Sequence, residues 1–317
     1  PGLIDPFFCG GFGLSIVHDD LGDIARCYVQ LGVTSFVPAI GALPCPLIKK
    51  MADNIRRAIA ADDPDRAQVL GLYAEGPFMK PDCAGISSRE FVMEPVSTNL
   101  EHFLDTVGDV LIMVNISPGT RSDRDAIRTL RRAGKVVSMA HSDAPSERVA
   151  ECIQAGATVL GHAWNNNPGR LTDVGAPGPT LEHQALVDDR ILAIHLICDG
   201  IHVHPLLMKL ILQCRGMDTI CLASDTLPQA GCPDGPFIWN DGRTFEKRNG
   251  ACFSEDNRLA GSAMLLPDQF RQFVVLTGTT RQKAIATVTG NVARSLGLDH
   301  RIGLLAPGRQ ADLVAWD

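Results

Sequence analysis

The sequence predicts a (β/α)8 TIM-type barrel, and three observations support this fold class. Short apolar runs alternate with amphipathic stretches, which is the pattern of βα units around a parallel sheet. Eight such runs precede residue 226, which suits the strand number and the length of the barrel. A doubly wound open sheet is the alternative, but no G-x-G-x-x-G motif follows an early apolar run.

The elements follow one another in a regular order. The predicted strands are 2–8, 34–40, 69–75, 110–117, 135–141, 158–163, 191–198 and 219–224. Helix-like segments lie between several of them, at 20–31, 46–61, 121–133, 145–155 and 205–214. Residues 228–262 then carry closely spaced Gly, Pro, Asn and Asp with short strand-like pieces, and helical segments follow at 266–277, 281–288 and 290–297. We assign residues 1–300 to the barrel domain.

Composition excludes several classes of partner. The net charge of −7 is spread along the 317 residues without a basic patch, so no nucleic acid and no anionic membrane surface is expected to bind. No apolar run is long enough to cross a membrane, and no signal peptide opens the chain. The ten cysteines are scattered without a C-x-x-C pair, which favours reduced thiols and a cytoplasmic location.

Polar residues able to bind a metal or move a proton stand where four predicted strands end. These residues are Glu75, His141, His162 and Asp225. The seventh strand ends in CDGIHVHP, which adds Asp199, His202 and His204 to the same rim. Because the carboxyl ends of barrel strands meet at one mouth, we expect these side chains to converge there.

Two histidines and one glutamate form a nitrogen, nitrogen and oxygen ligand set. Such a set suits one divalent ion with an open coordination position, with zinc first and iron, cobalt or manganese also possible. A bound cation would also compensate the charge of Glu75 at the end of an apolar strand. Considered one by one, each histidine could instead be an ordinary core residue, and Asp225 or Asp199 could be a helix cap.

An open metal position predicts hydrolysis at a carbonyl. The ion lowers the pKa of its bound water and polarises a substrate oxygen. Asp225 lies on a different strand from the three ligands and is the candidate general base, which later returns the proton to the leaving group.

Several motifs occur together and in a specific order. They are PGLIDPFFCGGFG, GLYAEGPFMKPDCAG, VVSMAHSDA, LGHAWNNNPG, ICDGIHVHP, LASDTLPQAG, RLAGSAM and IGLLAPGRQADLVAWD. This series resembles the N-acetylglucosamine-6-phosphate deacetylases of the amidohydrolase superfamily over essentially the whole chain. The resemblance implies a barrel plus a small β-sandwich built from both chain ends. Residues 301–317 would belong to that sandwich, with its remainder before residue 1 and beyond residue 317.

The resemblance also implies a role for each matching position, and a homodimer. Its metal ligands would be Glu75, His141 and His162, its catalytic aspartate Asp225, its phosphate-contacting histidine His202, and its substrate loop Asn165 with Asn166.

Three positions depart from the family pattern. Phe7 and Cys9 replace the His-x-His pair that holds a second metal in many superfamily members, so one ion is expected, with Cys9 a conceivable further ligand. Ser87 stands near the position of a carbonyl-polarising histidine, and we expect it to contact the substrate. Arg170 is out of register with the arginine that contacts phosphate across the family's dimer interface.

The sequence therefore predicts an amide hydrolase that acts on a small amino sugar. We expect it to remove the acetyl group of N-acetylglucosamine 6-phosphate by attack of a metal-bound water. Ser87 and Arg170 leave open an unphosphorylated or different N-acyl substrate. The missing family residues also leave open a non-catalytic sugar-binding protein.

Overall fold

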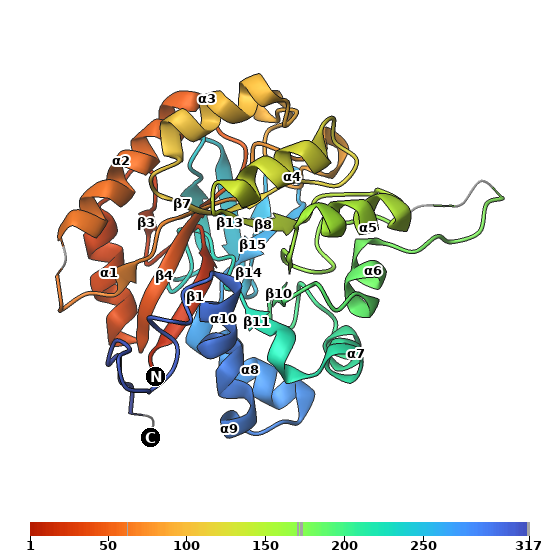
Figure 1. The fold of residues 1–317 in the computed structure, drawn as a ribbon. Coiled ribbons are helices and arrows are strands. Elements are labelled where there is room, and N and C mark those ends of the chain that lie inside the picture. The colour runs from red at the N-terminus through yellow and green to blue at the C-terminus, as the bar shows by residue number, and fades with distance from the viewer. Residues whose placement is uncertain (62, 170, 172–173, 316–317) are drawn as a thin grey trace.

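The strands form the barrel that the sequence predicts. The computed structural model describes residues 1–61, 63–169, 171 and 174–315 (Figure 1). Eight parallel strands follow one another in the order β1 (Leu3–Phe8), β4 (Val33–Ile40), β6 (Leu72–Ala74), β7 (Leu111–Asn115), β8 (Val136–Met139), β9 (Val159–Leu160), β10 (Ala193–Leu196) and β11 (Ile220–Leu222). A short strand, β5 (Gln68–Val69), pairs with β4, and β2 (Gly10–Gly11) pairs with β3 (Leu14–Ser15).

The first and last strands are joined just beyond β11. Asp225 N donates to Phe7 O at 2.9 Å, and Cys9 N donates to Thr226 O at 3.1 Å. The buried carboxylate of Asp5 supports this seam, because it accepts from Ser224 N at 3.1 Å and from the Tyr28 hydroxyl at 2.7 Å. These bonds satisfy polar groups that would otherwise be buried without partners.

Helices surround the strands, as Figure 1 shows. They are α1 (Leu21–Gln30), α2 (Cys45–Ala61), α3 (Ser97–Val107), α4 (Asp123–Arg132), α5 (Ser146–Ala155), α6 (Leu181–Val187), α7 (Pro205–Arg215), α8 (Leu266–Thr277), α9 (Arg281–Ala284) and α10 (Gly290–Ser295). Single 3-10 turns lie at Pro81–Cys83, Arg89–Phe91, Met217–Thr219 and Ile285–Val288. Helix α4 illustrates the packing, since it buries Ala126, Ile127 and Leu130 on one face.

A separate antiparallel sheet follows β11. It runs in the order β12 (Gly235–Ile238), β13 (Thr244–Arg248), β14 (Ala251–Ser254) and β15 (Leu259–Ser262). Phe237, Trp239 and Phe245 are buried in it, and they pack with the residues that fill the barrel interior, such as Tyr73 and Met113. The smaller sheet of the described structure thus comes from the segment after the eighth strand and not from the chain ends.

The tail carries no strand among its described residues, 301–315. It lies beside the start of the chain, where Gly2 N donates to Asp312 O at 2.9 Å (Figure 1). The assignment of residues 301–317 to a small β-sandwich therefore stays a prediction.

All eight strand predictions are confirmed, whereas two helices were not expected. Helix α3 buries Leu100, Phe103 and Val107, whose spacing is helical, but it follows a long irregular segment. Helix α6 has only seven residues, too few to give a clear period. No helix within the described ranges combines the length and apolarity needed to cross a bilayer. All ten cysteines are free.

Candidate active site

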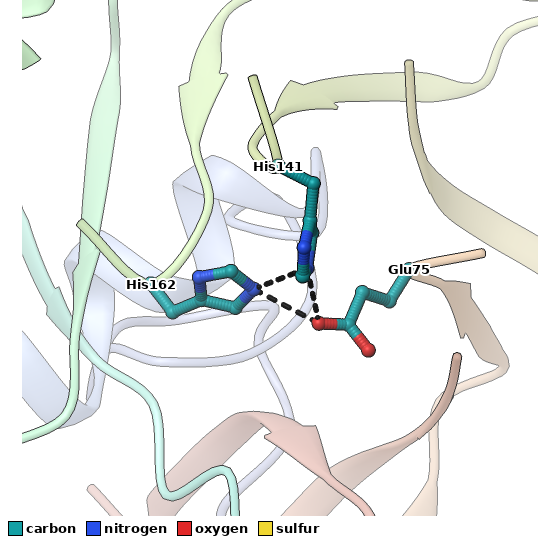
Figure 2. Close-up of side chains that lie close together, drawn as sticks. All are labelled: Glu75, His141 and His162. Carbon is teal, nitrogen blue, oxygen red and sulfur yellow. Dashed lines mark hydrogen bonds and ion pairs between the residues drawn. The ribbon is translucent and has the colours of Figure 1, made fainter. Parts of the chain in front are cut away.

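Three strand ends bring the predicted metal ligands together. Glu75 follows β6, His141 follows β8 and His162 follows β9. Glu75 Oε1 lies 2.8 Å from His141 Nε2 and 2.9 Å from His162 Nε2, and the two ring nitrogens are 3.1 Å apart (Figure 2). Among the described residues, this is the one group of three or more His, Cys, Asp or Glu side chains whose possible ligand atoms all lie within 4.8 Å of one another.

The backbone and a carbonyl orient His141. Its Nδ1 donates to Cys83 O at 2.7 Å, which fixes the ring so that Nε2 faces the cluster, where it would be the ligand atom for a metal. Its φ of 56° lies in the left-handed region, which non-glycine residues adopt mainly where the surroundings require it.

The cluster fits a divalent cation. Both histidine rings are buried and aim Nε2 at the same carboxylate oxygen, so two ring nitrogens and a carboxylate converge on one point (Figure 2). Burial by itself would raise the pKa of Glu75, but hydrogen bonds and charge from His141 and His162 lower it below its ordinary value. A cation would supply that positive charge permanently, and nitrogen, nitrogen and oxygen ligands suit zinc and its neighbours.

Phe7, which stands where the resemblance implies a ligand of a second metal, presents an aromatic ring that cannot ligate. Phe7 packs edge-on against His162, with ring centroids 5.9 Å apart, and against Tyr73 at 4.9 Å. Cys9 lies next to it, with Sγ 3.9 Å from Asp225 Oδ1. Burial and the carboxylates of Asp225 and Glu75 raise the pKa of the Cys9 thiol well above its ordinary value. Cys9 is not part of the ligand group.

Asp225 lies in the same cavity as the cluster. It also has a left-handed backbone, with φ of 47°. Burial and then the charge of Glu75 raise its pKa to about 7, against the lowering effect of His162 and His202. A carboxylate that gains and releases a proton near neutral pH suits general acid–base catalysis.

His202 lines the cavity but both its ring nitrogens have partners. Nδ1 donates to Asp199 Oδ2 at 2.6 Å, and Nε2 donates to Ala260 O at 2.5 Å. Because both partners are acceptors, the ring carries two protons and a positive charge. Although burial alone would lower it, bonding to Asp199 raises the pKa of His202. The structure therefore places a fixed positive charge here, without a free donor.

Ser87 reaches the cavity next to a glycine. Its Oγ accepts from Ala42 N at 3.3 Å, which leaves the hydroxyl hydrogen able to donate. A Cβ at Gly41 would lie 2.3 Å from Ser87 Oγ and 3.5 Å from Glu75 Oε2, so a larger residue at position 41 would displace the serine hydroxyl from its present place. Asn165 and Asn166 line the same cavity. Arg170 lies outside the described residues.

The cavity has a second wall that the sequence did not indicate. Trp239, Asn240 and Asp241, together with 259–261, line it from the antiparallel sheet. Its volume of about 160 Å³ suits a small substrate, being below that of typical drug-sized pockets. No Lys or Arg occurs among the described lining residues.

Comparison with known proteins places the chain in a family. A model described as "Amidohydrolase family" matches residues 28–317. The chain belongs to the amidohydrolase family. Among its relatives, an N-acetylgalactosamine-6-phosphate deacetylase from Escherichia coli O157:H7 is 31% identical and is aligned over 100% of this chain and 83% of the relative. An N-acetylglucosamine-6-phosphate deacetylase from Vibrio furnissii is 29% identical, and the alignment covers 99% of this chain and 78% of the relative.

Solved structures agree with this family assignment. An N-acetylglucosamine-6-phosphate deacetylase from Thermotoga maritima superimposes with a TM-score of 0.88 at 25% identity, covering 98% of this chain and 82% of the other. A mutant of the N-acetyl-D-glucosamine-6-phosphate deacetylase from Mycobacterium smegmatis, in complex with N-acetyl-D-glucosamine-6-phosphate, superimposes with a TM-score of 0.87 at 25% identity. The superposition covers 98% of this chain and 80% of the other. The expectations of a barrel and of this family are confirmed. This amidohydrolase is a hydrolase of amide C–N bonds.

Proposed function

We propose that this amidohydrolase removes the acetyl group from an N-acetylated amino-sugar 6-phosphate. N-acetylglucosamine 6-phosphate is the first substrate to test. One observation carries the proposal: the Glu75, His141 and His162 cluster shares a small cavity with the buried carboxylate of Asp225. The relatives supply the substrate class, since they are deacetylases of N-acetylglucosamine or N-acetylgalactosamine 6-phosphate.

We propose that Glu75, His141 and His162 hold one divalent ion, with zinc first and iron, cobalt or manganese as alternatives. When bound there, such an ion supplies an activated water and polarises the amide carbonyl. Asp225 then accepts the proton of the attacking water and returns it to the amide nitrogen, so that acetate and a free amine leave.

We assign the contacts with the substrate to three groups. The Ser87 hydroxyl donates to the amide carbonyl oxygen, on which negative charge develops. Asn165 and Asn166 bond sugar hydroxyls from the loop after β9. The imidazolium of His202 attracts the phosphate, and Nε2 exchanges its bond to Ala260 O for a phosphate oxygen.

A second candidate is favoured by the composition of the cavity wall. Its described residues include Glu75, Asp225 and Asp241 but no Lys or Arg, which is unusual for a phosphate site. The alternative is the same deacetylation of an unphosphorylated or differently substituted N-acetylhexosamine.

We also propose a cytoplasmic homodimer. The described residues Leu171, Val174, Val187 and Leu206 are exposed apolar side chains in and after the segment that follows β9. A second subunit would remove these side chains from water. Ten free cysteines suit a reducing compartment. Light scattering of the purified protein should give twice the chain mass if the dimer exists.

The test is acetate release by zinc-reconstituted protein. N-acetylglucosamine 6-phosphate, N-acetylgalactosamine 6-phosphate and both unphosphorylated sugars are compared at equal concentrations. The proposal predicts release that requires the phosphate. Release from unphosphorylated sugars alone would support the second candidate, and no release from any of the four, with metal bound, would reject both.

A further inference from the structure

The loop at residues 83–87, here the 83–87 loop, connects the metal cluster to the antiparallel sheet. Cys83 O accepts from His141 Nδ1 at 2.7 Å, so the loop sets the orientation of a metal ligand. Ala84, Ile86 and Ser87 line the cavity. Small movements of this loop would therefore disturb both a ligand and the proposed carbonyl contact.

Two arginines of the antiparallel sheet hold the middle of the 83–87 loop. Arg258 donates to Gly85 O at 2.7 Å, and Arg243 donates to Ile86 O at 2.6 Å. These arginines stand at separate places in the sheet, before β15 and before β13, yet they bind consecutive carbonyls. Charged donors to backbone carbonyls are among the stronger hydrogen bonds in proteins.

Arg243 is itself held in place. Its guanidinium bonds Asp241 Oδ2 at 2.6 Å and lies 5.5 Å from the ring centroid of Phe245. Asp241 lines the cavity. A continuous chain of contacts thus runs from the cavity wall at Asp241 through Arg243 to Ile86 of the loop.

On its opposite side, the loop packs closely against Asn166 at Gly85. Its φ is 60°, and a Cβ there would lie 2.7 Å from Asn166 Nδ2. The loop is enclosed between the asparagine of the β9 loop and the arginines of the sheet. Its position is therefore set from both sides.

We propose that Arg243 and Arg258 are positioning residues, which fix the 83–87 loop so that His141 and Ser87 keep their working geometry. The inference rests on the proposed deacetylation for the role of Ser87, but not for that of His141. Neither arginine lines the cavity, so direct contact with the substrate is not their role in this arrangement. Sheet and metal cluster would then act as one unit.

The experiment compares Arg243→Met, Arg258→Met and the double variant with the unaltered protein. Arg243→Lys and Arg258→Lys keep a charged donor and guard against loss of folding. Arg248→Met is the matched control, because Arg248 lies in the same sheet and bonds Glu246 and Asn257 instead of the loop. Three readouts are used: amide hydrogen exchange of residues 79–92, zinc affinity by competition with a chromophoric chelator, and kcat/KM.

We expect the double Met variant to exchange the 79–92 amides faster and to bind zinc roughly three- to tenfold more weakly, less than the loss of a direct ligand partner. The Lys variants should recover most of the zinc affinity, and Arg248→Met should match the unaltered protein. In a Ser87→Ala background, the arginine changes should lower kcat/KM by a smaller factor than alone, because both act through one contact.

Unchanged amide exchange of residues 79–92 in the double Met variant would overturn the proposal. It would also be overturned if Arg248→Met changed exchange and zinc affinity as much as the double variant does. If the arginine changes lowered kcat/KM by the same factor with and without Ser87→Ala, the part of the proposal that concerns Ser87 would be overturned. If the unaltered protein hydrolyses none of the test sugars, the proposed function fails alone, because exchange and zinc affinity still test the positioning role.

Discussion

The two walls of the cavity differ in how they are built. The metal wall, Glu75, His141 and His162, stands at the ends of barrel strands, and its side chains are 16%, 3% and 4% exposed. The sheet wall, Trp239–Asp241 and 259–261, belongs to a segment beyond the barrel, and it combines the buried side chains of Trp239 and Asn240 with Leu259, which is 39% exposed. We propose a division of labour between them: the metal wall performs the chemistry, and the sheet wall helps to select the substrate.

The largest effect is expected from the metal wall. Replacing His162 by Ala removes one of the three proposed ligands and leaves Glu75 and His141 facing each other. We expect loss of bound metal and of all measurable turnover, whichever substrate is used, because the activated water depends on the ion. Elemental analysis and acetate release are the measurements. Cys9→Ala is the control and should keep its metal; retention of metal and activity by His162→Ala would contradict the division.

A smaller loss is expected from Asp225, which belongs to neither group of wall residues. Asp225→Asn should keep its metal and lose 10²- to 10⁴-fold in kcat, roughly the contribution of a general acid–base group. In the unaltered enzyme the base must be ionised, so kcat/KM should fall as pH drops through the pKa of Asp225. That pKa is about 7 without metal, and a cation lowers it, which places the acid limb below pH 7. A rate that rises on acidification would contradict this role.

The smallest effect is expected from the sheet wall. Leu259→Ala removes an exposed apolar contact without opening the core. We expect KM to rise a few-fold and kcat to change little, since losing a partly exposed apolar contact costs about 1 kcal/mol. The ratio of kcat/KM between the phosphorylated and unphosphorylated sugars should also shift. An equal fall in kcat for all substrates would show that this wall takes part in the chemistry.

The sequence predicted the metal wall because barrel geometry leaves little choice. Residues that directly follow parallel strands must meet at the carboxyl edge, so Glu75, His141 and His162 could be brought together without knowing any loop. Asp225 follows from the same rule. That the site holds one ion stays a prediction; it is consistent with the ring of Phe7, which packs against His162 and offers no ligand atom.

The sheet wall could not be predicted in the same way. Trp239 and Leu259 are separated from the last barrel strand by loops whose paths depend on tertiary contacts, not on local periodicity. The sequence also could not predict that both ring nitrogens of His202 have hydrogen-bond partners, because one partner, Ala260 O, belongs to that sheet. Strand-like pieces were expected in residues 228–262, where the antiparallel sheet lies, but the sequence did not indicate that this sheet would line the cavity.

The Phe7 ring has a consequence for supply of metal to the protein. A two-metal site fills in two steps, and partly loaded molecules differ in activity from fully loaded ones. The Phe7 ring offers no ligand atom beside His162, so if the cluster holds one ion as proposed, that ion would load in one step. Each chain would then be either metal-bound or metal-free, and the active fraction would follow the concentration of free metal along one simple saturation curve.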